Sequence, residues 1–218
     1  MRFPALCGAA LFAFGLSTAT GQTLPPTTHA TPAAEVEPAV PRMPVRNAPI
    51  ASYTFDLNAH IVMRTFPWLK FHISGKGRYE RNGDLMLHLD GMPWFARAYQ
   101  NVNMASVLEP QTWGKQYVVA YSHRHGGTVE LIMHDRGKTP LTEARATIDD
   151  DAGLRELDWS YSYGGKIRLM VSPGDASGYT LPAVMNVEAD MPRYAASAQA
   201  AFTNYRVVTD ASGSATAE

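Results

Sequence analysis

The stretch "LRELDWSYSYGGKIRLMV", residues 154–171, alternates between apolar and polar side chains on both sides of a pair of glycines. Strict alternation is typical of a half-buried strand, and a glycine pair between two such runs is typical of a hairpin turn. The stretch therefore predicts a β-hairpin with one apolar and one polar face. Its apolar positions are Leu157, Trp159, Tyr161, Tyr163, Ile167, Leu169 and Val171.

The same alternation recurs along most of the chain. Because antiparallel strands with one solvated face show this pattern, the sequence predicts a mainly β (α+β) fold built on an antiparallel sheet. The further apolar positions are Phe55, Leu57, Ala59, Ile61 and Met63; Phe71, Ile73 and Tyr79; Leu85, Leu87 and Leu89; Val129, Leu131 and Met133; and Leu181, Met185 and Val187.

The alternation also predicts the lengths of three turns. Directly paired residues share a face, so apolar positions should lie opposite apolar positions. Three-residue loops at 81–83, 125–127 and 163–165 satisfy this condition, and each would end in a glycine with positive φ. They would place Tyr79 opposite Leu85, Tyr121 opposite Leu131, Trp159 opposite Leu169 and Tyr161 opposite Ile167.

Helix signals are few. Ala98, Val102, Ala105 and Leu108 follow one another at helical spacing before Pro110, which predicts a helix over 95–108. A second segment, 195–200, fits a short helix or the start of a strand.

The N-terminus has the features of an export signal. Arg2 precedes an apolar run from Ala9 to Leu16, and small residues follow at Ala19 and Gly21. We expect a signal peptide at 1–21, a Pro/Thr/Ala-rich linker at 22–48, one domain at 49–209 and a disordered tail at 210–218. Cys7 is the one cysteine of the chain and lies in the expected signal peptide, so a periplasmic protein without disulfides is predicted.

The charge pattern argues against two classes of partner. Lys and Arg number 19 against 20 Asp and Glu, and they form no basic block. Nucleic-acid binding would need a concentrated positive surface, and a polybasic membrane segment would need a run of cations.

An apolar sheet face must be covered by another layer. A second sheet, a closed barrel, or a curved sheet with a small cover would each serve. The last arrangement leaves an apolar cavity for a ligand, although a plain filled core would show the same pattern. The candidate lipid-binding residues are Leu57, Ile61, Met63, Phe71, Ile73, Leu87, Trp94, Phe95, Tyr121, Leu131, Met133, Trp159, Tyr161, Leu169 and Met185.

The order of features over 53–208 resembles the periplasmic lipoprotein-carrier (LolA-like) superfamily, which includes outer-membrane lipoprotein-sorting proteins. The features are "YTFDLNAHIVMR", "GKGRY", "LDWSYSYGGKIRL", "GYTLPAVMNVEADMP" and "FTNYRVV". The resemblance implies a half-barrel of antiparallel strands with short covering helices, and transport of acyl chains or lipoproteins in its hollow. The Pro-rich linker stands where such proteins have an amphipathic helix, and no functional residue of the family can be assigned to a position here.

Motifs of common catalytic sites are absent from the sequence. His123 and His125 form a weak metal motif at an expected hairpin tip, and residues 148–153, "IDDDAG", fit an acidic turn better than a calcium loop. Asp158 and Arg168 are expected to form a weak charge pair, and His60, His72 and His88 to face solvent.

These observations lead to one prediction with two alternatives. We expect an exported, non-enzymatic carrier of acyl lipid or lipoprotein, monomeric, without cofactor or metal, working with a membrane-bound donor or acceptor protein. The alternatives are an interaction module with a filled β core and a hydrolase with an unrecognised site.

Overall fold

A computed structural model of the chain describes residues 47–81, 84–92, 97, 100–137 and 139–210. The expected signal peptide, nearly all of the linker, most of the tail, and the candidate residues Trp94 and Phe95 lie outside the described residues.

The described residues form one antiparallel sheet of 11 strands, in the order β4-β3-β2-β1-β11-β10-β9-β8-β7-β6-β5. Nearly all neighbours in the sheet are neighbours in sequence, and β1 pairs with β11 to join the two halves. The strands are β1 Ile50–Met63, β2 Lys70–Glu80, β3 Asp84–Asp90, β4 Asn101–Asn103, β5 Tyr117–His125, β6 Thr128–Asp135, β7 Leu141–Asp149, β8 Gly153–Tyr161, β9 Lys166–Ala176, β10 Tyr179–Met191 and β11 Tyr194–Thr209.

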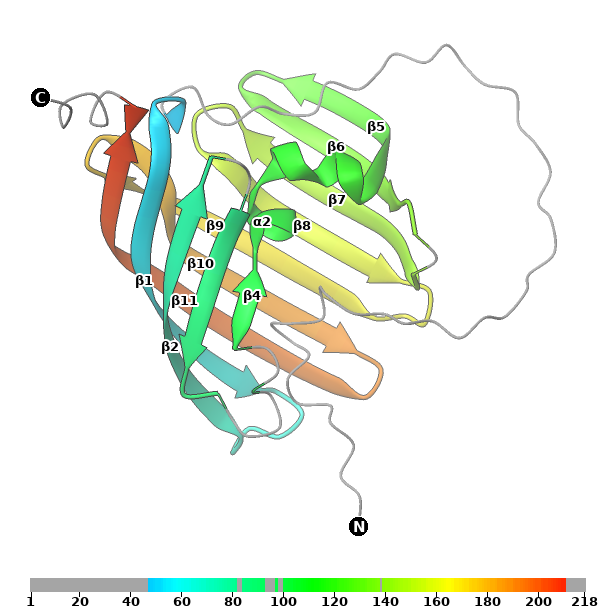
Figure 1. The fold of residues 1–218 in the computed structure, drawn as a ribbon. Coiled ribbons are helices and arrows are strands. Elements are labelled where there is room, and N and C mark those ends of the chain that lie inside the picture. The colour runs from blue at the N-terminus through cyan, green and yellow to red at the C-terminus, as the bar shows by residue number, and fades with distance from the viewer. Residues whose placement is uncertain (1–46, 82–83, 93–96, 98–99, 138, 211–218) are drawn as a thin grey trace, which may run out of the picture.

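The sheet is curved and open. β4 and β5 are its two edges, and two short helices, α2 (Ala105–Leu108) and η3 (Pro110–Lys115), lie over the concave face between them (Figure 1). The predicted half-barrel with one or two covering helices is thereby confirmed. No helix among the described residues is long and apolar enough to cross a membrane.

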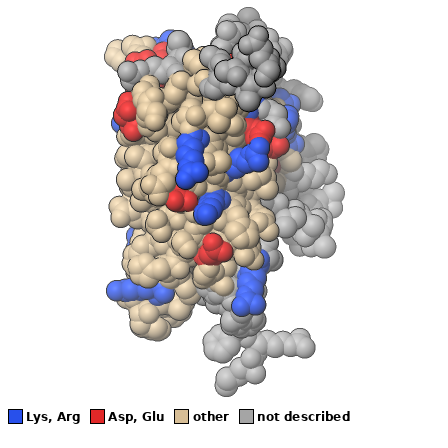
Figure 2. Space-filling view, turned by 60° about the vertical axis from the view of Figure 1, so that its left-hand side comes forward, with Lys and Arg blue, Asp and Glu red and all other residues tan. Residues whose placement is uncertain are grey.

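The alternation of apolar and polar residues in the sequence gives the sheet one apolar face and one charged face. Buried residues alternate with more exposed ones in β1 from Tyr53, in β2 from Ile73 and throughout β3. Their large apolar side chains belong to a single cluster that continues through β6 to β11. The outer face of the sheet carries cations and carboxylates side by side, as Figure 2 shows on one side of the molecule. Arg168, for example, donates one hydrogen bond of 2.9 Å to Asp158, and its Nε lies 3.0 Å from a carboxylate oxygen of Glu156.

The turn predictions had mixed outcomes. Tyr79 pairs with Leu85 as expected for a loop at 81–83. Trp159, however, pairs with Ile167 rather than Leu169, so the β8–β9 loop is longer by two residues. A slip of two residues keeps every side chain on its face, which is why the apolar pattern could not distinguish the registers. Positive φ falls on Gly164 rather than Gly165.

The β5–β6 prediction was wrong by one residue. Tyr121 pairs with Ile132 rather than Leu131, because the loop is one residue shorter than predicted and His125 pairs with Thr128. An irregularity between Val119 and Tyr121 restores the predicted register, so that Val119 pairs with Met133. The loop is the glycine pair alone, and Gly126 has φ +58°.

The helix prediction over 95–108 was wrong for most of its described length. Residues Asn101–Asn103 pair with β3 as strand β4, and α-helix in the described part of this range is confined to Ala105–Leu108. Pairing with the edge of β3 satisfies backbone groups that an isolated helix turn would satisfy less well, so the sheet overrides the helical spacing. Residues 195–200 are part of β11.

Candidate functional site

Most candidate lipid-binding residues lie together on the concave face. Phe71 and Tyr161 are half-buried and pack against the apolar cluster from its margin. The remaining members are buried within the cluster: Leu57, Ile61, Met63, Ile73, Leu87, Leu131, Met133, Trp159, Leu169 and Met185.

Tyr121 is the exception among the described candidates. The irregularity in β5 turns its side chain to the other face, where it is 52% exposed and stacks near His123, with ring centroids 6.4 Å apart. Tyr121 therefore cannot line the concave face in this arrangement.

The concave face is covered by residues Met104–Gln116, which we call the cover segment. Its buried side chains are Met104, Ala105, Val107, Pro110 and Trp113. The ring of Trp113 packs edge-on against Tyr117 at 6.3 Å, and the Tyr117 hydroxyl accepts a hydrogen bond of 3.0 Å from the Trp159 indole. Within the described part of the chain, this short segment covers the apolar cluster of the concave face.

The cover segment is joined to the sheet by hydrogen bonds only near its two ends. The Met104 amide donates to the Leu85 carbonyl at 2.7 Å, and Arg136 donates to the carbonyls of Gly114 and Gln116. Among the described residues, the hydrogen bonds of the stretch from Ala105 to Trp113 stay within residues 103–116. Ala105 donates to the Asn103 side chain of β4 at 2.9 Å. Residues 106–113, as far as the structure describes their hydrogen bonds, make none to the sheet and are held against it by apolar contact.

A cavity of about 60 Å³ lies where the cover segment meets one end of the sheet; we call it the mouth cavity. Its apolar lining comes from strands far apart in the sequence: Ile50, Ile148, Leu154, Val171 and Leu181. Leu108, Glu109, Pro110 and Gln111 form the side provided by the cover segment. The volume is well below the roughly 300 Å³ at which small-molecule sites begin.

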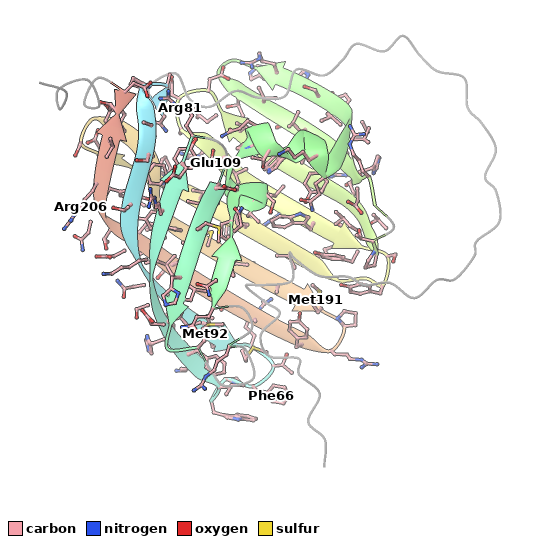
Figure 3. The ribbon with its side chains drawn as sticks, in the orientation of Figure 1. Phe66, Arg81, Met92, Glu109, Met191 and Arg206 are labelled. Atoms are coloured by element: carbon pink, nitrogen blue, oxygen red, sulfur yellow. The ribbon has the colours of Figure 1, made fainter. Side chains whose placement is uncertain are left out.

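Glu109 is the one acidic side chain that lines the mouth cavity (Figure 3). Its half-buried carboxylate accepts a 2.6 Å hydrogen bond from Gln111, and no salt bridge among the described residues involves it. Desolvation raises the pKa of Glu109 to about 7, although the hydrogen bond from Gln111 opposes the shift. The mouth cavity therefore changes charge near neutral pH.

Two stacked tyrosines face Glu109 from the sheet. The rings of Tyr53 and Tyr79 lie 4.7 Å apart, and both line the mouth cavity. Burial, followed by the nearby Glu109 carboxylate, raises the pKa of each hydroxyl. The Tyr79 hydroxyl is buried and has no hydrogen-bond partner in the described structure. A buried hydroxyl without a partner is costly, and it is available to a polar group of a ligand.

Sequence reasoning missed Glu109, Tyr53 and Tyr79. The available signal was the charged residue in "SVLEP", residues 106–110, where an otherwise apolar run meets a proline. Nothing in the sequence showed that this segment would lie over the ends of β1 and β2.

The side chains considered as metal ligands or general bases do not come together in a site. No group of three or more His, Cys, Asp or Glu side chains in the described part of the chain could hold a metal ion. His123 and His125 are exposed on β5, and Asp149 accepts hydrogen bonds from the backbone of residues 151 and 152, as an acidic turn requires. His60 and His72 lie with ring centroids 4.4 Å apart on the outer face.

No protein-family model matches the chain, and no curated protein matches its sequence. Solved structures similar in fold include a LolA superfamily protein of Nitrosomonas europaea, at 6% identity and TM-score 0.49 over 73% of this chain and 87% of that one. A domain assigned to outer membrane lipoprotein sorting in Vibrio parahaemolyticus matches at 10% identity and TM-score 0.48, over 76% and 90%. A DUF1329 family protein of Desulfovibrio piger matches at 11% and 0.46, over 74% and 89%.

Two of these structures are described as a LolA superfamily protein and an outer membrane lipoprotein-sorting domain, the family whose order of features the sequence resembles. At these identities and TM-scores the likeness says nothing of a ligand or partner.

Proposed function

We propose that the protein is an exported carrier that binds acyl chains of lipids or lipoproteins between the concave face of its sheet and the cover segment. The observation that carries the proposal is that a short segment, held in its middle by apolar contact alone, covers the apolar face of an open 11-stranded sheet. The protein acts by binding and release rather than by catalysis.

Binding requires the cover segment to move. The mouth cavity of about 60 Å³ is too small for a long chain, so the ligand must replace contacts that the cover segment makes with the sheet. Among the described hydrogen bonds, lifting residues 106–113 breaks none that joins them to the sheet. Burial of an acyl chain contributes about 0.8 kcal/mol per CH₂, so a long chain can offset the lost contacts.

The surface beneath the cover segment suits ligands of varied shape. Met63, Met133 and Met185 are buried on the strands, and Met104 is buried at the start of the cover segment. Methionine side chains are unbranched and polarisable, and they repack around different apolar groups more readily than branched side chains.

The setting follows from the sequence at the N-terminus. A signal-like segment at 1–21 and a Pro-rich linker at 22–48 support a role in a bacterial periplasm, where a membrane-bound protein would donate or accept the lipid. We further propose that the carrier is a monomer.

Native mass spectrometry of protein purified gently from a bacterial periplasm, followed by organic extraction, tests the proposal. We expect co-purified acyl lipid near one equivalent and uptake of a fluorescent fatty acid by delipidated protein. Ala152→Trp, which adds bulk at the mouth cavity, should reduce uptake at least about tenfold, a change of about 1.4 kcal/mol. Ala201→Trp, the same change at a half-buried site on the outer face, should leave uptake intact.

The small cavity also favours a second candidate, an interaction module whose β core is filled. This candidate predicts a lipid-free mass, no fatty-acid uptake and equal behaviour of the two tryptophan variants. Such a result would overturn the carrier proposal and direct attention to the surface.

A further inference from the structure

Three strand turns meet at the end of the half-barrel opposite the mouth cavity. They connect β1 to β2, β8 to β9 and β10 to β11, and we call the surface of residues 64–70, 163–166 and 190–194 the aromatic end patch. Arg64 donates its amide to the Ala195 carbonyl at 2.7 Å, and Tyr163 contacts Met191. Figure 3 shows Phe66 and Met191 at this end, away from Glu109.

The aromatic end patch exposes large apolar side chains. Trp68 is 80% exposed, Tyr163 51% and Phe66 42%. The rings of Phe66 and Trp68 pack edge to face at 5.6 Å, and those of Tyr161 and Tyr163 stack at 5.4 Å. Aromatic side chains gathered in one place on a surface mark an interaction site more often than scattered ones do.

The β1–β2 turn presents its aromatics in a fixed backbone. The Phe66 amide donates to the Met63 carbonyl at 3.1 Å, and the Leu69 amide donates to Phe66 at 2.8 Å. The Thr65 hydroxyl accepts a 2.6 Å hydrogen bond from the Ala195 amide, which ties the turn to the neighbouring one. Because the turn is short and tied at several points, Trp68 cannot fold back onto the core.

The charge of the aromatic end patch differs from that of the whole chain. Four exposed cations face one carboxylate, a net charge of +3, whereas the full chain carries −1. No run of basic residues signals this, because the cations come from three separate turns. They are Arg64, Lys70, Lys166 and Arg193, and the carboxylate is Asp190.

We propose that the aromatic end patch docks on the surface of a bilayer containing anionic phospholipid. Phe66 and Trp68 enter the boundary between headgroups and acyl chains, where tryptophan and other aromatic side chains are favoured. The surrounding cations meet lipid phosphates. A protruding aromatic turn can enter a soft lipid interface, whereas a protein partner would need a matching pocket.

Docking at this end would place the concave face next to the bilayer. Leu69, Phe71, Met92, Tyr161, Met191 and Tyr194 are half-buried and pack against the core, so apolar surface continues from the aromatic end patch toward the concave face. A membrane would bind the patch whether or not the concave face holds a ligand, so failure of the carrier proposal would leave this one standing.

Sedimentation with vesicles tests the docking surface. Protein beginning at Gln22 is mixed with vesicles of phosphatidylcholine containing roughly a third phosphatidylglycerol, and with vesicles of phosphatidylcholine alone. We expect binding to the anionic vesicles, weakened at least tenfold by Phe66→Ser/Trp68→Ser and several-fold by Lys70→Gln/Arg193→Gln. The matched variant Met86→Ser/Tyr121→Ser, which removes two exposed apolar side chains elsewhere, should bind like the unchanged protein.

Trp68 provides a second readout in the same samples. Its fluorescence, taken as the difference between the protein and Trp68→Phe, should shift to shorter wavelength on anionic vesicles and be quenched by brominated acyl chains. Thermal unfolding confirms that each variant is folded. Absence of vesicle binding, or binding that survives Phe66→Ser/Trp68→Ser in folded protein, would overturn the proposal and point to a protein partner.

Discussion

The two ends of the half-barrel differ in the exposure of their aromatic side chains and in the sign of the charges beside them. At the mouth cavity, Tyr53 and Tyr79 are buried beneath a cover segment that carries a half-buried carboxylate. At the aromatic end patch, Phe66 and Trp68 are exposed and surrounded by cations. The same strands connect both ends, so among the described residues the difference comes from the turns and from the cover segment.

From this difference we infer separate roles for the mouth cavity and the aromatic end patch. A covered end with a titratable group suits opening and closing, and an exposed aromatic end with positive charge suits contact with another surface. Stability should therefore depend on residues beneath the cover segment, and surface contact on residues of the aromatic end patch.

The largest difference in the free energy of unfolding is expected between alanine substitutions of two tryptophans, Trp159 and Trp68. Trp159 is 2% exposed and donates a hydrogen bond to Tyr117, so Trp159→Ala should lower the free energy of unfolding by about 3–5 kcal/mol. Trp68→Ala should change it by no more than about 0.5 kcal/mol, because exposed side chains lose little on truncation. Urea unfolding followed by circular dichroism measures both.

A charged residue placed in the apolar cluster that contains Trp159 gives a stricter test of the ligand-binding face. Leu169→Asp should abolish both folding and lipid uptake, since an unpaired carboxylate would replace a side chain in the apolar cluster. A Leu169→Asp protein that stayed folded and kept its lipid would show that Leu169 does not line a ligand site or a core.

The next effect concerns the charge of Glu109. Its pKa of about 7 in the folded protein lies above the ordinary 4.5, so the folded state keeps a proton that the unfolded state releases between these values. The contribution of Glu109 to stability should be largest at and below pH 4.5, fall as the pH rises to about 7, and then level off. At 1.36 kcal/mol per pKa unit, the loss is at most about 3 kcal/mol.

Glu109→Gln isolates this contribution. The variant should match the unchanged protein near pH 4.5 and exceed it in stability at pH 8, as measured by urea unfolding across the pH range. Glu80→Gln, a change at the exposed Arg78–Glu80 ion pair, serves as the control and should show no comparable difference. Equal pH profiles for Glu109→Gln and the unchanged protein would mean that the Glu109 carboxyl is solvated and that the mouth end carries no switch.

Sequence alone predicted the sheet and its two faces well, since alternation in segments such as Phe55–Met63 depends only on local residues. The pairing register of neighbouring strands was harder to predict from the sequence. The irregularity before Tyr121 left no trace in the pattern, and the two-residue slip at Trp159 preserved both faces. The mouth cavity was not predictable at all, because it needs the distance between Glu109 and strands dozens of residues away.

A smaller effect should distinguish the hydroxyl of the buried Tyr79 from that of the half-buried Tyr205 by the sign of the change in the free energy of unfolding. The Tyr79 hydroxyl has no partner in the described structure, whereas that of Tyr205 donates a 2.6 Å hydrogen bond to the Pro182 carbonyl. Tyr79→Phe should therefore raise the free energy of unfolding by about 1 kcal/mol, and Tyr205→Phe should lower it by a similar amount.

A bound lipid should cancel the first of these effects. If the polar group of a bound lipid accepts the hydrogen bond of Tyr79, Tyr79→Phe would be more stable when empty and would bind lipid less tightly, by about 1 kcal/mol or roughly fivefold. Tyr205→Phe would lose stability without that loss of affinity. Equal affinities for the two variants would place the lipid headgroup away from Tyr79, and only the apolar part of the mouth end would then contact the chain.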